Sequence, residues 1–409
     1  MRTHRWAALV AGMAGVAVLQ SAGGVGADIA SDRAAAIVLF PKLVVESLST
    51  STVTTGTGYA VDTIVQISNT SADLVRAHCF YIDASSRCSI SGYACDPNAE
   101  NPCPINPKDQ CLPGWVETDF NVVLTPRQPL AWSVSKGLPN KELPLDGIFR
   151  RGIGGSSNIG TGIPPAPVHP TIYSISADTK AESFVGELKC IAVDGEGRAI
   201  AQNALKGEAT IVNLVASFGV SSTQEIPNVE KYSAIGIQAI EGDANGDNVL
   251  ELGGGSNEYN GCSNILIADH FFDFATNPIN GNDMVSDLTL VPCTQDLRNQ
   301  EAGSTTVQYL VFNEFEQRFS TSKPVDCFFE SQLSRIDTRN PERSIFSVYV
   351  SGTLTGQTRI RGVQTGLLGI VRETACAATA DVQFYVEHSS AFNLQMQGER
   401  AAGDRIVLP

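Results

Sequence analysis

Between residues 62 and 83 the chain alternates apolar and polar side chains in two runs, separated by a short polar break. The first run places alternate residues of 63–67 on one face, and the second does the same over 75–81. The break, Asn69 to Asp73, is rich in short polar side chains that hydrogen-bond their own backbone and favour turns. A period of two bounded by turn residues predicts two half-buried antiparallel strands joined as a hairpin. Cys79 lies on the apolar face of the second strand and should point into a core.

The sequence Asn69-Thr70-Ser71 between two strands resembles the turn found in many exported bacterial immunoglobulin-like or fibronectin-III-like sandwiches. Residues 120–132 (FNVVLTPRQPLAW) resemble a second piece of such domains, in which Pro126 starts a turn between strands. The resemblance implies an all-β fold of antiparallel sandwiches. It implies no function, because fold and function are separable.

The second half of the chain repeats parts of this pattern. Residues 306–313 are similar to residues 63–69, and residues 325–329 (VDCFF) are similar to residues 77–81 (AHCFY). The repeat predicts two β-sandwiches in one chain.

The predicted organisation has four parts. A first sandwich spans 28–230 and contains a cysteine-rich insertion at 84–114 and a Gly/Pro-rich loop at 137–170. A second sandwich spans 231–395 and begins with a connecting hairpin at 231–260, in which 232–240 pairs with 248–252. A signal peptide at 1–27 precedes them, and a tail at 396–409 follows.

The first 27 residues have the pattern of a secretory signal. Arg2 and Arg5 precede the apolar run 6–19, and small residues at 25–27 form a cleavage site. A retained membrane anchor is the alternative, but the run is shorter than the roughly 20 residues that a span needs. No later segment is long and apolar enough to cross a bilayer. The sequence therefore predicts an exported protein. With the bacterial origin that the resemblance implies, it would be periplasmic, on the cell surface or extracellular.

The net charge of −15 becomes more negative when the signal peptide leaves, because that segment carries arginines and no acids. Binding to nucleic acid or to an anionic membrane surface requires cationic patches. We therefore expect no nucleic-acid partner, and we expect an unidentified protein or surface partner, with self-association as a possibility.

The ten cysteines all follow the signal peptide, and an even number in an exported chain predicts disulfides. The four in the insertion are seven or eight residues apart, which does not fit the short spacing of zinc ligands. They should form two local bridges among themselves. The insertion cysteines are Cys88, Cys95, Cys103 and Cys111. The repeat predicts two further bridges, Cys79–Cys190 and Cys327–Cys376. Cys262 and Cys293 remain, flank two predicted strands, and should pair with each other.

One loop has the spacing of a calcium site. Asp243, Asn245, Asp247 and Glu251 occupy positions one, three, five and nine of a calcium-binding loop. Position six is Asn248 instead of glycine, and position twelve is not acidic. A hairpin turn rich in Asp, Asn and Gly is the favoured interpretation, with calcium as the alternative and no other cofactor expected.

Other candidate catalytic groups are weaker. Asp269, His270 and Asp273 could ligate a metal, but the favoured interpretation of His270 is a polar residue at the end of a strand. Glu387 and His388 are adjacent on a strand and so point to opposite faces, which prevents a triad. A glycosidase needs only two carboxylates at the right separation, and spacing alone cannot select them from acids that include Glu314, Glu316 and Glu330.

These observations predict an all-β protein of two antiparallel, immunoglobulin-like sandwiches stapled by disulfides. Its predicted role is that of a non-enzymatic structural or interaction protein of the bacterial envelope or exterior. The first alternative is a module that binds glycans or a divalent cation, and the second is a hydrolase that uses a carboxylate pair. Trp115 and Trp132 are few for a sugar-stacking platform, so we expect both in the core.

Overall fold

The protein is described by a computed structural model that covers residues 33–47, 59–95, 101–139, 162–170, 182–213, 228–253, 258–276, 283–378, 384–400 and 403–409. The described chain is nearly all β, and its sheets are antiparallel except for one short pairing, which confirms the predicted fold class. None of its helices has the length and apolarity needed to cross a membrane. The predicted signal peptide and most of the Gly/Pro-rich loop lie outside the described residues.

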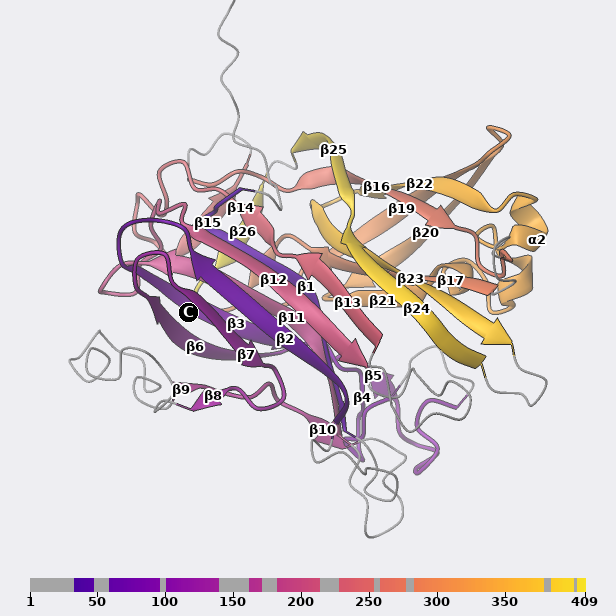
Figure 1. Cartoon of the computed structure of the whole chain (residues 1–409), viewed down its shortest axis with the longest axis horizontal. Coiled ribbons are helices and arrows are strands. Elements are labelled where there is room, and N and C mark those ends of the chain that lie inside the picture. The colour runs from indigo at the N-terminus through magenta and orange to yellow at the C-terminus, as the bar shows by residue number, and fades with distance from the viewer. Residues whose placement is uncertain are drawn as a thin grey trace, which may run out of the picture.

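The first half of the chain forms one branched sheet that folds into two layers (Figure 1). One layer has the order β14-β1-β11-β3-β6 and the other has the order β13-β12-β2-β7, with β10 added beside β11. The layers join where the end of β1 pairs with the start of β2, at Glu46 and Val61. The strands are β1 (Ile37–Ser47), β2 (Tyr59–Asn69), β3 (Val75–Asp83), β6 (Val116–Leu124), β7 (Pro129–Ser133), β10 (His169–Pro170), β11 (Glu182–Val193), β12 (Leu205–Asn213), β13 (Asn228–Ser233) and β14 (Ile235–Ile237).

Aromatic side chains fill the space between these two layers. The indole Nε1 of Trp132 on β7 donates a 2.6 Å hydrogen bond to the hydroxyl oxygen of Tyr81 on β3, across the sandwich. Phe120 lies edge-on to Trp132, with ring centroids 6.2 Å apart. Buried Tyr and Trp usually find a hydrogen-bond partner, and here the hydroxyl oxygen of Tyr81 accepts the indole hydrogen of Trp132. Trp132 therefore belongs to the core, as predicted, whereas Trp115 is only partly buried and packs against it.

The predicted hairpin between residues 62 and 83 is wrong in one respect. Both strands are present, but β2 pairs with β12 and β7, whereas β3 pairs with β11 and β6. The chain crosses from one layer to the other at the turn. Buried Asn69 makes this crossing: its amide donates to the carbonyl oxygens of Asp73 and Thr125, and so ties the turn to the loop between β6 and β7.

The second half forms another two-layered sandwich. Its layers have the orders β20-β19-β22-β16-β25 and β21-β17-β23-β24, and one cluster of buried apolar side chains lies between them. The strands are β16 (Ser263–Phe271), β17 (Asp283–Pro292), β19 (Ser304–Asn313), β20 (Arg318–Asp326), β21 (Phe329–Gln332), β22 (Thr355–Gly362), β23 (Leu367–Ala378), β24 (Phe384–Asn393) and β25 (Gln395–Arg400). The short helices η3 (Leu333–Arg335), η4 (Pro341–Arg343) and α2 (Val348–Ser351) lie between β21 and β22.

A small third sheet lies at the junction of the sandwiches. The C-terminal strand β26 (Asp404–Val407) pairs antiparallel with β15 (Val249–Leu252) and parallel with β18 (Gln295–Asp296). Its buried side chains belong to the same apolar cluster as the first sandwich, and that cluster continues to Leu368 and Ile370 on β23. The two sandwiches are therefore packed together through a shared core.

This sheet corrects two expectations about organisation. Residues 248–252 pair with the C-terminal β26 and not with residues 232–240, which belong to the first sandwich as β13 and β14. The C-terminal segment is likewise no free tail, because β25 completes a sheet of the second sandwich. The local turn at Asp243–Asp247 suggested a hairpin, but the pairing depends on a strand more than 150 residues away.

Four disulfides form. Cys79 and Cys190 are directly opposed on β3 and β11, and Cys262–Cys293 closes the start of the second sandwich, both as predicted. The insertion contains two local bridges, Cys88–Cys103 and Cys95–Cys111. Short pairs of strands brace it and the neighbouring loop, namely β4 (Arg87–Cys88) with β5 (Cys111–Leu112), and β8 (Leu138–Pro139) with β9 (Gly162–Ile163).

The predicted bridge between Cys327 and Cys376 is wrong, since both are free thiols. Strand β17 lies between β21 and β23, pairs Leu290 with Phe329, and pairs Asp283 with Cys376. At about 3.3 Å per residue, this register separates Phe329 from Cys376 by roughly 23 Å along the sheet, and Cys327 precedes Phe329 on the side away from Cys376. A disulfide needs Cα atoms within about 7 Å. The predicted bridge rested on short motifs that are similar in the two halves. The strand order differs between the two sandwiches, so similar motifs do not occupy equivalent places.

Candidate functional site

The predicted calcium loop is an ordered turn that uses its own oxygens. Asp243 accepts from the backbone amides of Gly246 and Asn248, and Asn245 accepts from that of Asp247. Asp247 in turn accepts from the amide of Val249 at 2.8 Å. Asn248 has a φ of 61°, a conformation that Asn adopts more easily than most residues. Such hydrogen bonds from backbone amides to Asp and Asn side chains are those expected of a polar turn.

The residues of the second metal candidate are engaged in hydrogen bonds within the second sandwich, and Asp269 accepts one from the amide of Gln357. Buried His270 donates from Nδ1 to the carbonyl of Phe271 and accepts at Nε2 from the hydroxyl of Thr358. Buried Asp273 accepts from the backbone amides of Ser286 and Ser334 and so fixes the start of η3. These residues act as internal connectors of the second sandwich. The side chains of Glu387 and His388 lie outside the described residues.

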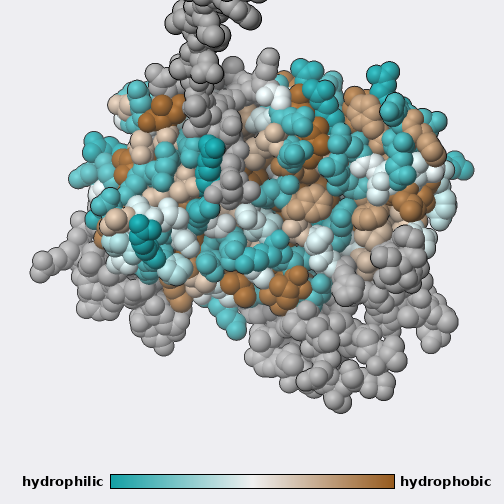
Figure 2. All heavy atoms as spheres, turned by 45° about the horizontal axis from the view of Figure 1, so that its top comes forward, coloured by the Kyte–Doolittle hydropathy of each residue, from teal (hydrophilic) through white to brown (hydrophobic). Residues whose placement is uncertain are grey.

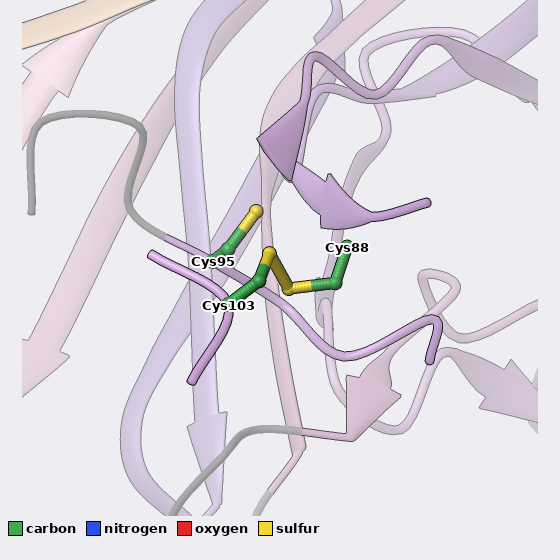
Figure 3. Close-up of side chains that lie close together, drawn as sticks. All are labelled: Cys88, Cys95 and Cys103. Carbon is green, nitrogen blue, oxygen red and sulfur yellow. A yellow bond between two sulfur atoms is a disulfide. The ribbon is translucent and has the colours of Figure 1, made fainter. Parts of the chain in front are cut away.

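The cysteine-rich insertion brings the sulfur atoms of Cys88, Cys95 and Cys103 within 4.8 Å of one another (Figure 3). All three are in disulfides, so none is available as a thiolate ligand. The insertion is anchored at its root: the buried carboxylate of Asp83 pairs with Arg87 at 2.9 Å and with His169 at 2.5 Å. Its disulfides and this anchor make it a braced surface loop.

The junction between the sandwiches contains charged groups that sequence reasoning missed. Lys42 is buried on β1, and its amine donates to the carboxylate of Glu330 on β21. A β-bulge separates Phe40 from Leu43, and the hydroxyl of Tyr232 contacts both the amide and the carbonyl of Lys42 there. The signal was available in the sequence, since Lys42 follows Pro41 inside an otherwise apolar strand.

Arg372 on β23 forms the second charged contact of the junction. Its Nε donates to Glu230 on β13 at 2.8 Å, and Ser389 on β24 donates to the same carboxylate oxygen at 2.5 Å. Asp287 lies 3.9 Å from the guanidinium. Burial disfavours the charge on Arg372, but the carboxylates of Glu230 and Asp287 outweigh it and raise the pKa of Arg372. These bonds join the first sandwich to the second.

The far end of the second sandwich, which we call the distal tip, consists of the turn at residues 313–317, helix α2 and Leu354. Buried Asn313 holds the turn together: it accepts from the amides of Phe315 and Gln317 and donates to the carbonyl of Ser351 at 2.7 Å. Glu314 accepts from the amide and the hydroxyl of Thr355. Side-chain hydrogen bonds therefore fix three separate chain segments in one arrangement.

Large apolar side chains project from the distal tip into solvent. Phe315 is 71% exposed, Tyr349 is 67% exposed, and Val350 and Leu354 are each 39% exposed. The ring of Tyr349 stacks on Phe274, with centroids 5.8 Å apart. Figure 2 shows hydrophobic side chains among hydrophilic ones at this end of the molecule. Exposed apolar side chains on a frame held by hydrogen bonds can form an interaction surface.

Beside the distal tip lies a hollow of about 500 Å³ with three carboxylates in its lining, those of Asp269, Glu314 and Glu373. Burial raises the pKa of Glu373, although its hydrogen bond from the amide of Phe271 acts in the opposite direction. Hydrogen bonds from Thr355 lower the pKa of Glu314. Two carboxyl groups in one hollow thus have pKa values displaced in opposite directions, which is a pattern of acid–base pairs.

Of the three acids named from the sequence, Glu314 lines this hollow and Glu330 pairs with Lys42 at the junction. Glu373 was missed, because a single glutamate on a strand of ordinary composition gives no signal. No protein-family model matches the sequence, and no curated protein and no solved structure matches it either.

Proposed function

We propose that the protein is an exported, non-enzymatic interaction module whose distal tip contacts a partner. The observation that carries the proposal is the exposure of Phe315 and Tyr349 on a tip fixed by Asn313 and Glu314. Aromatic side chains bring large contact area at a low cost in conformational entropy, and they are enriched at the centres of interfaces. Bacterial origin, signal-directed export and an immunoglobulin-like kinship of the sandwiches are parts of the same proposal.

The disulfides fit export, because such bonds form and persist in oxidising compartments. The frame behind the distal tip fits an interaction role as well. A shared core and the contacts of Lys42 and Arg372 join the sandwiches, so binding at the distal tip requires little ordering of the module.

The test is the double variant Phe315→Ala/Tyr349→Ala, compared with the wild type by chemical cross-linking on the producing cells followed by mass spectrometry of the cross-linked species. We expect the variant to lose the cross-linked partner while keeping its melting temperature. The matched control is Ile90→Ala, which removes a 62% exposed apolar side chain from the cysteine-rich insertion. A partner lost in Ile90→Ala and kept in the double variant would move the binding surface to the insertion.

A hydrolase is the second candidate, and the hollow with Glu314 and Glu373 favours it. Glu373 would donate a proton and Glu314 would act as the base or nucleophile. Glu373→Gln and Glu314→Gln should each abolish release of reducing sugar from a panel of polysaccharides, with Glu316→Gln as the exposed control on the same turn. No release by the wild type on any member of the panel would count against this candidate.

The same double variant tests the glycan part of the sequence-based alternative. A glycan array probed with the wild type and the Phe315→Ala/Tyr349→Ala variant tests whether the partner at the distal tip is a carbohydrate. Binding lost in the double variant would identify the partner class as glycan instead of protein.

A further inference from the structure

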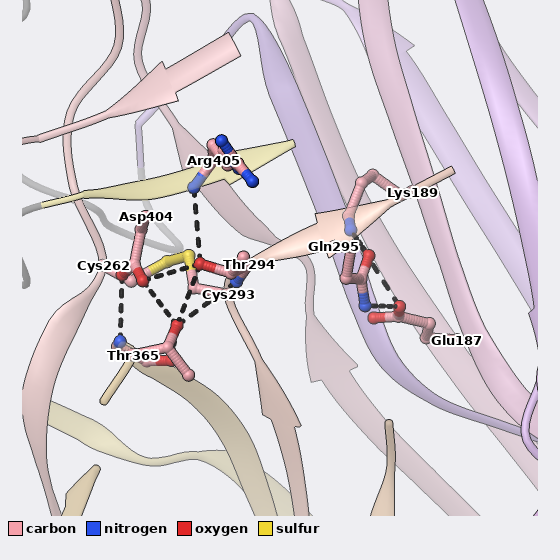
Figure 4. Close-up of a disulfide and its surroundings, with 10 residues drawn as sticks. Glu187, Lys189, Cys262, Cys293, Thr294, Gln295, Thr365, Asp404 and Arg405 are labelled. Carbon is pink, nitrogen blue, oxygen red and sulfur yellow. Dashed lines mark hydrogen bonds and ion pairs between the residues drawn. A yellow bond between two sulfur atoms is a disulfide. The ribbon is translucent and has the colours of Figure 1, made fainter. Parts of the chain in front are cut away.

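Three side chains meet in the interior between the sandwiches, and we call them the buried trio. Strand β11 places Glu187 and Lys189 two residues apart on the face that points toward the second sandwich, and β18 places Gln295 against them (Figure 4). Their exposures are 1%, 0% and 1%. A lysine, a glutamate and a glutamine without solvent contact are costly to bury, so their arrangement calls for an explanation.

The carboxamide of Gln295 is contacted at both ends. The amine of Lys189 donates to its Oε1, and its Nε2 donates to Oε1 of Glu187. The amine nitrogen of Lys189 lies 4.0 Å from the same oxygen of Glu187. The three groups therefore close a triangle, with the amine at the carbonyl and the carboxyl group at the amide nitrogen.

Neighbouring bonds hold Gln295 in place. The preceding residue, Thr294, donates to the buried carboxylate of Asp404 at 2.8 Å, and Cys293 before it is in the disulfide with Cys262 (Figure 4). The backbone of Gln295 pairs with Ile406 of β26. Lys189 and Glu187 lie on a strand that is paired on both sides. Lys189 and Gln295 are thus held on two separate rigid elements.

Burial also sets the protonation states of the trio. It lowers the pKa of Lys189 and raises the pKa of Glu187, against the attraction between the two groups. The second carboxyl oxygen of Glu187, Oε2, has no hydrogen-bond partner among the described residues, as expected for a neutral acid more than for a carboxylate. A neutral amine is a nucleophile, and a carboxylic acid is a proton donor.

We propose that Lys189 and Gln295 react to form an intramolecular isopeptide bond, with Glu187 as the proton relay. The amine nitrogen moves from Oε1 onto the adjacent carbonyl carbon of Gln295, and the new C–N bond forms. Glu187 gives its proton to Nε2 and takes one from the attached nitrogen of Lys189. The bond from the carbonyl carbon to Nε2 breaks, ammonia leaves, and the carboxylic acid of Glu187 is regenerated.

The fold supplies what this reaction needs. Holding an amine and an amide together in a dry site provides a large effective concentration, up to about 10⁵–10⁸ M in well-oriented systems. The product replaces an ionisable amine in the core by an amide. It also links β11 of the first sandwich covalently to β18 at the base of the second, independently of any role of the distal tip.

The test is the mass of the folded, purified full-length protein after reduction and alkylation of all cysteines. We expect the measured mass to be lower, by one ammonia molecule, than the mass calculated from the sequence of the purified chain. Digestion with trypsin and a second protease should then yield a linked peptide pair that contains Lys189 and Gln295, with no cleavage after Lys189. A folded wild type whose Lys189 peptide is unlinked would overturn the proposal.

Variants assign the roles. Lys189→Met and Glu187→Gln should each have the mass calculated from their sequence, without the loss of ammonia. Lys42→Met removes another buried lysine of the junction and should keep the linked peptide. Asn-Gly sequences also lose ammonia on ageing, but they produce no linked pair, so the peptide assignment separates the two processes. A linked peptide in Glu187→Gln would remove the relay role. If the variants do not fold, the wild-type peptide map still decides whether the bond exists.

Discussion

The two sandwiches have similar architecture, but their cores are held together by different chemistry. The first has a disulfide between β3 and β11 in its centre, with Tyr81 and Trp132 packed beside it. The second has two free thiols and relies on buried polar side chains, those of His270, Asp273 and Asn313, each bonded to backbone or hydroxyl groups. A covalent bridge does not depend on pH, whereas hydrogen bonds to titratable groups do. The stability of the second core should therefore vary with pH through His270 and Asp273, whose contributions have opposite signs.

Removing the central bridge of the first sandwich should have the largest effect. The bridge joins cysteines 111 residues apart in sequence, and closing a loop of that size stabilises by roughly 4–5 kcal/mol in the chain-entropy model. We expect Cys79→Ala/Cys190→Ala to lower the free energy of unfolding by about that amount, measured by urea denaturation without reductant.

The control for that experiment is Cys376→Ala, which removes a thiol of the second sandwich without breaking a bond. Its cost should stay below about 1 kcal/mol, since a half-buried thiol makes few contacts. Equal losses in the two variants would show that the central disulfide does not distinguish the sandwiches.

Breaking the junction should come next and should separate the two sandwiches. Arg372→Met leaves Glu230, which is 1% exposed, without its cation, and removing one partner of a buried pair costs about 3–5 kcal/mol. We expect the urea transition to become less cooperative, with one sandwich unfolding before the other.

The neighbouring pair gives a matched control. Lys231→Met removes the exposed partner of Glu208, whose 2.7 Å contact should contribute at most about 1 kcal/mol. An unchanged single transition in Arg372→Met would show that the shared apolar core alone couples the sandwiches.

The smallest of these effects concerns pH and the second sandwich alone. Burial lowers the pKa of His270 to about 4, against roughly 6.5 in an unfolded chain. Between these values the unfolded state binds more protons, so stability is lost as the pH falls from 6.5 toward 4. At pH 5 the loss should be about 2 kcal/mol, and His270→Gln should flatten this slope in pH-dependent urea denaturation.

Asp273 changes the stability of the same sandwich with pH in the opposite direction. Burial raises its pKa to about 6, so the folded state binds the extra proton and stability rises as the pH falls through 6 toward 4. Asp273→Asn should remove this gain and make the wild-type decline in acid steeper. A variant with a shallower acid decline than the wild type would contradict the assignment.

The sequence predicted much of the fold because its signals are local. Alternation revealed β2, β3 and β19, and apolar position placed Cys79 and Trp132 in the core. The spacing of the four insertion cysteines gave two local bridges. The candidate sites were less predictable. Glu373, Glu230 and Gln295 are single polar residues on ordinary strands, and only their neighbours in space distinguish them.

The class of fold and the two local bridges of the insertion follow from short stretches of sequence, because strand period and cysteine spacing are local properties. Which strands are neighbours depends on the tertiary structure. Strand order set β17 between Cys327 and Cys376, brought the C-terminal β26 onto β15, and turned Lys189 toward Gln295. These contacts join residues that are tens to more than a hundred positions apart, and a one-dimensional pattern does not encode which of many compatible strands will pair.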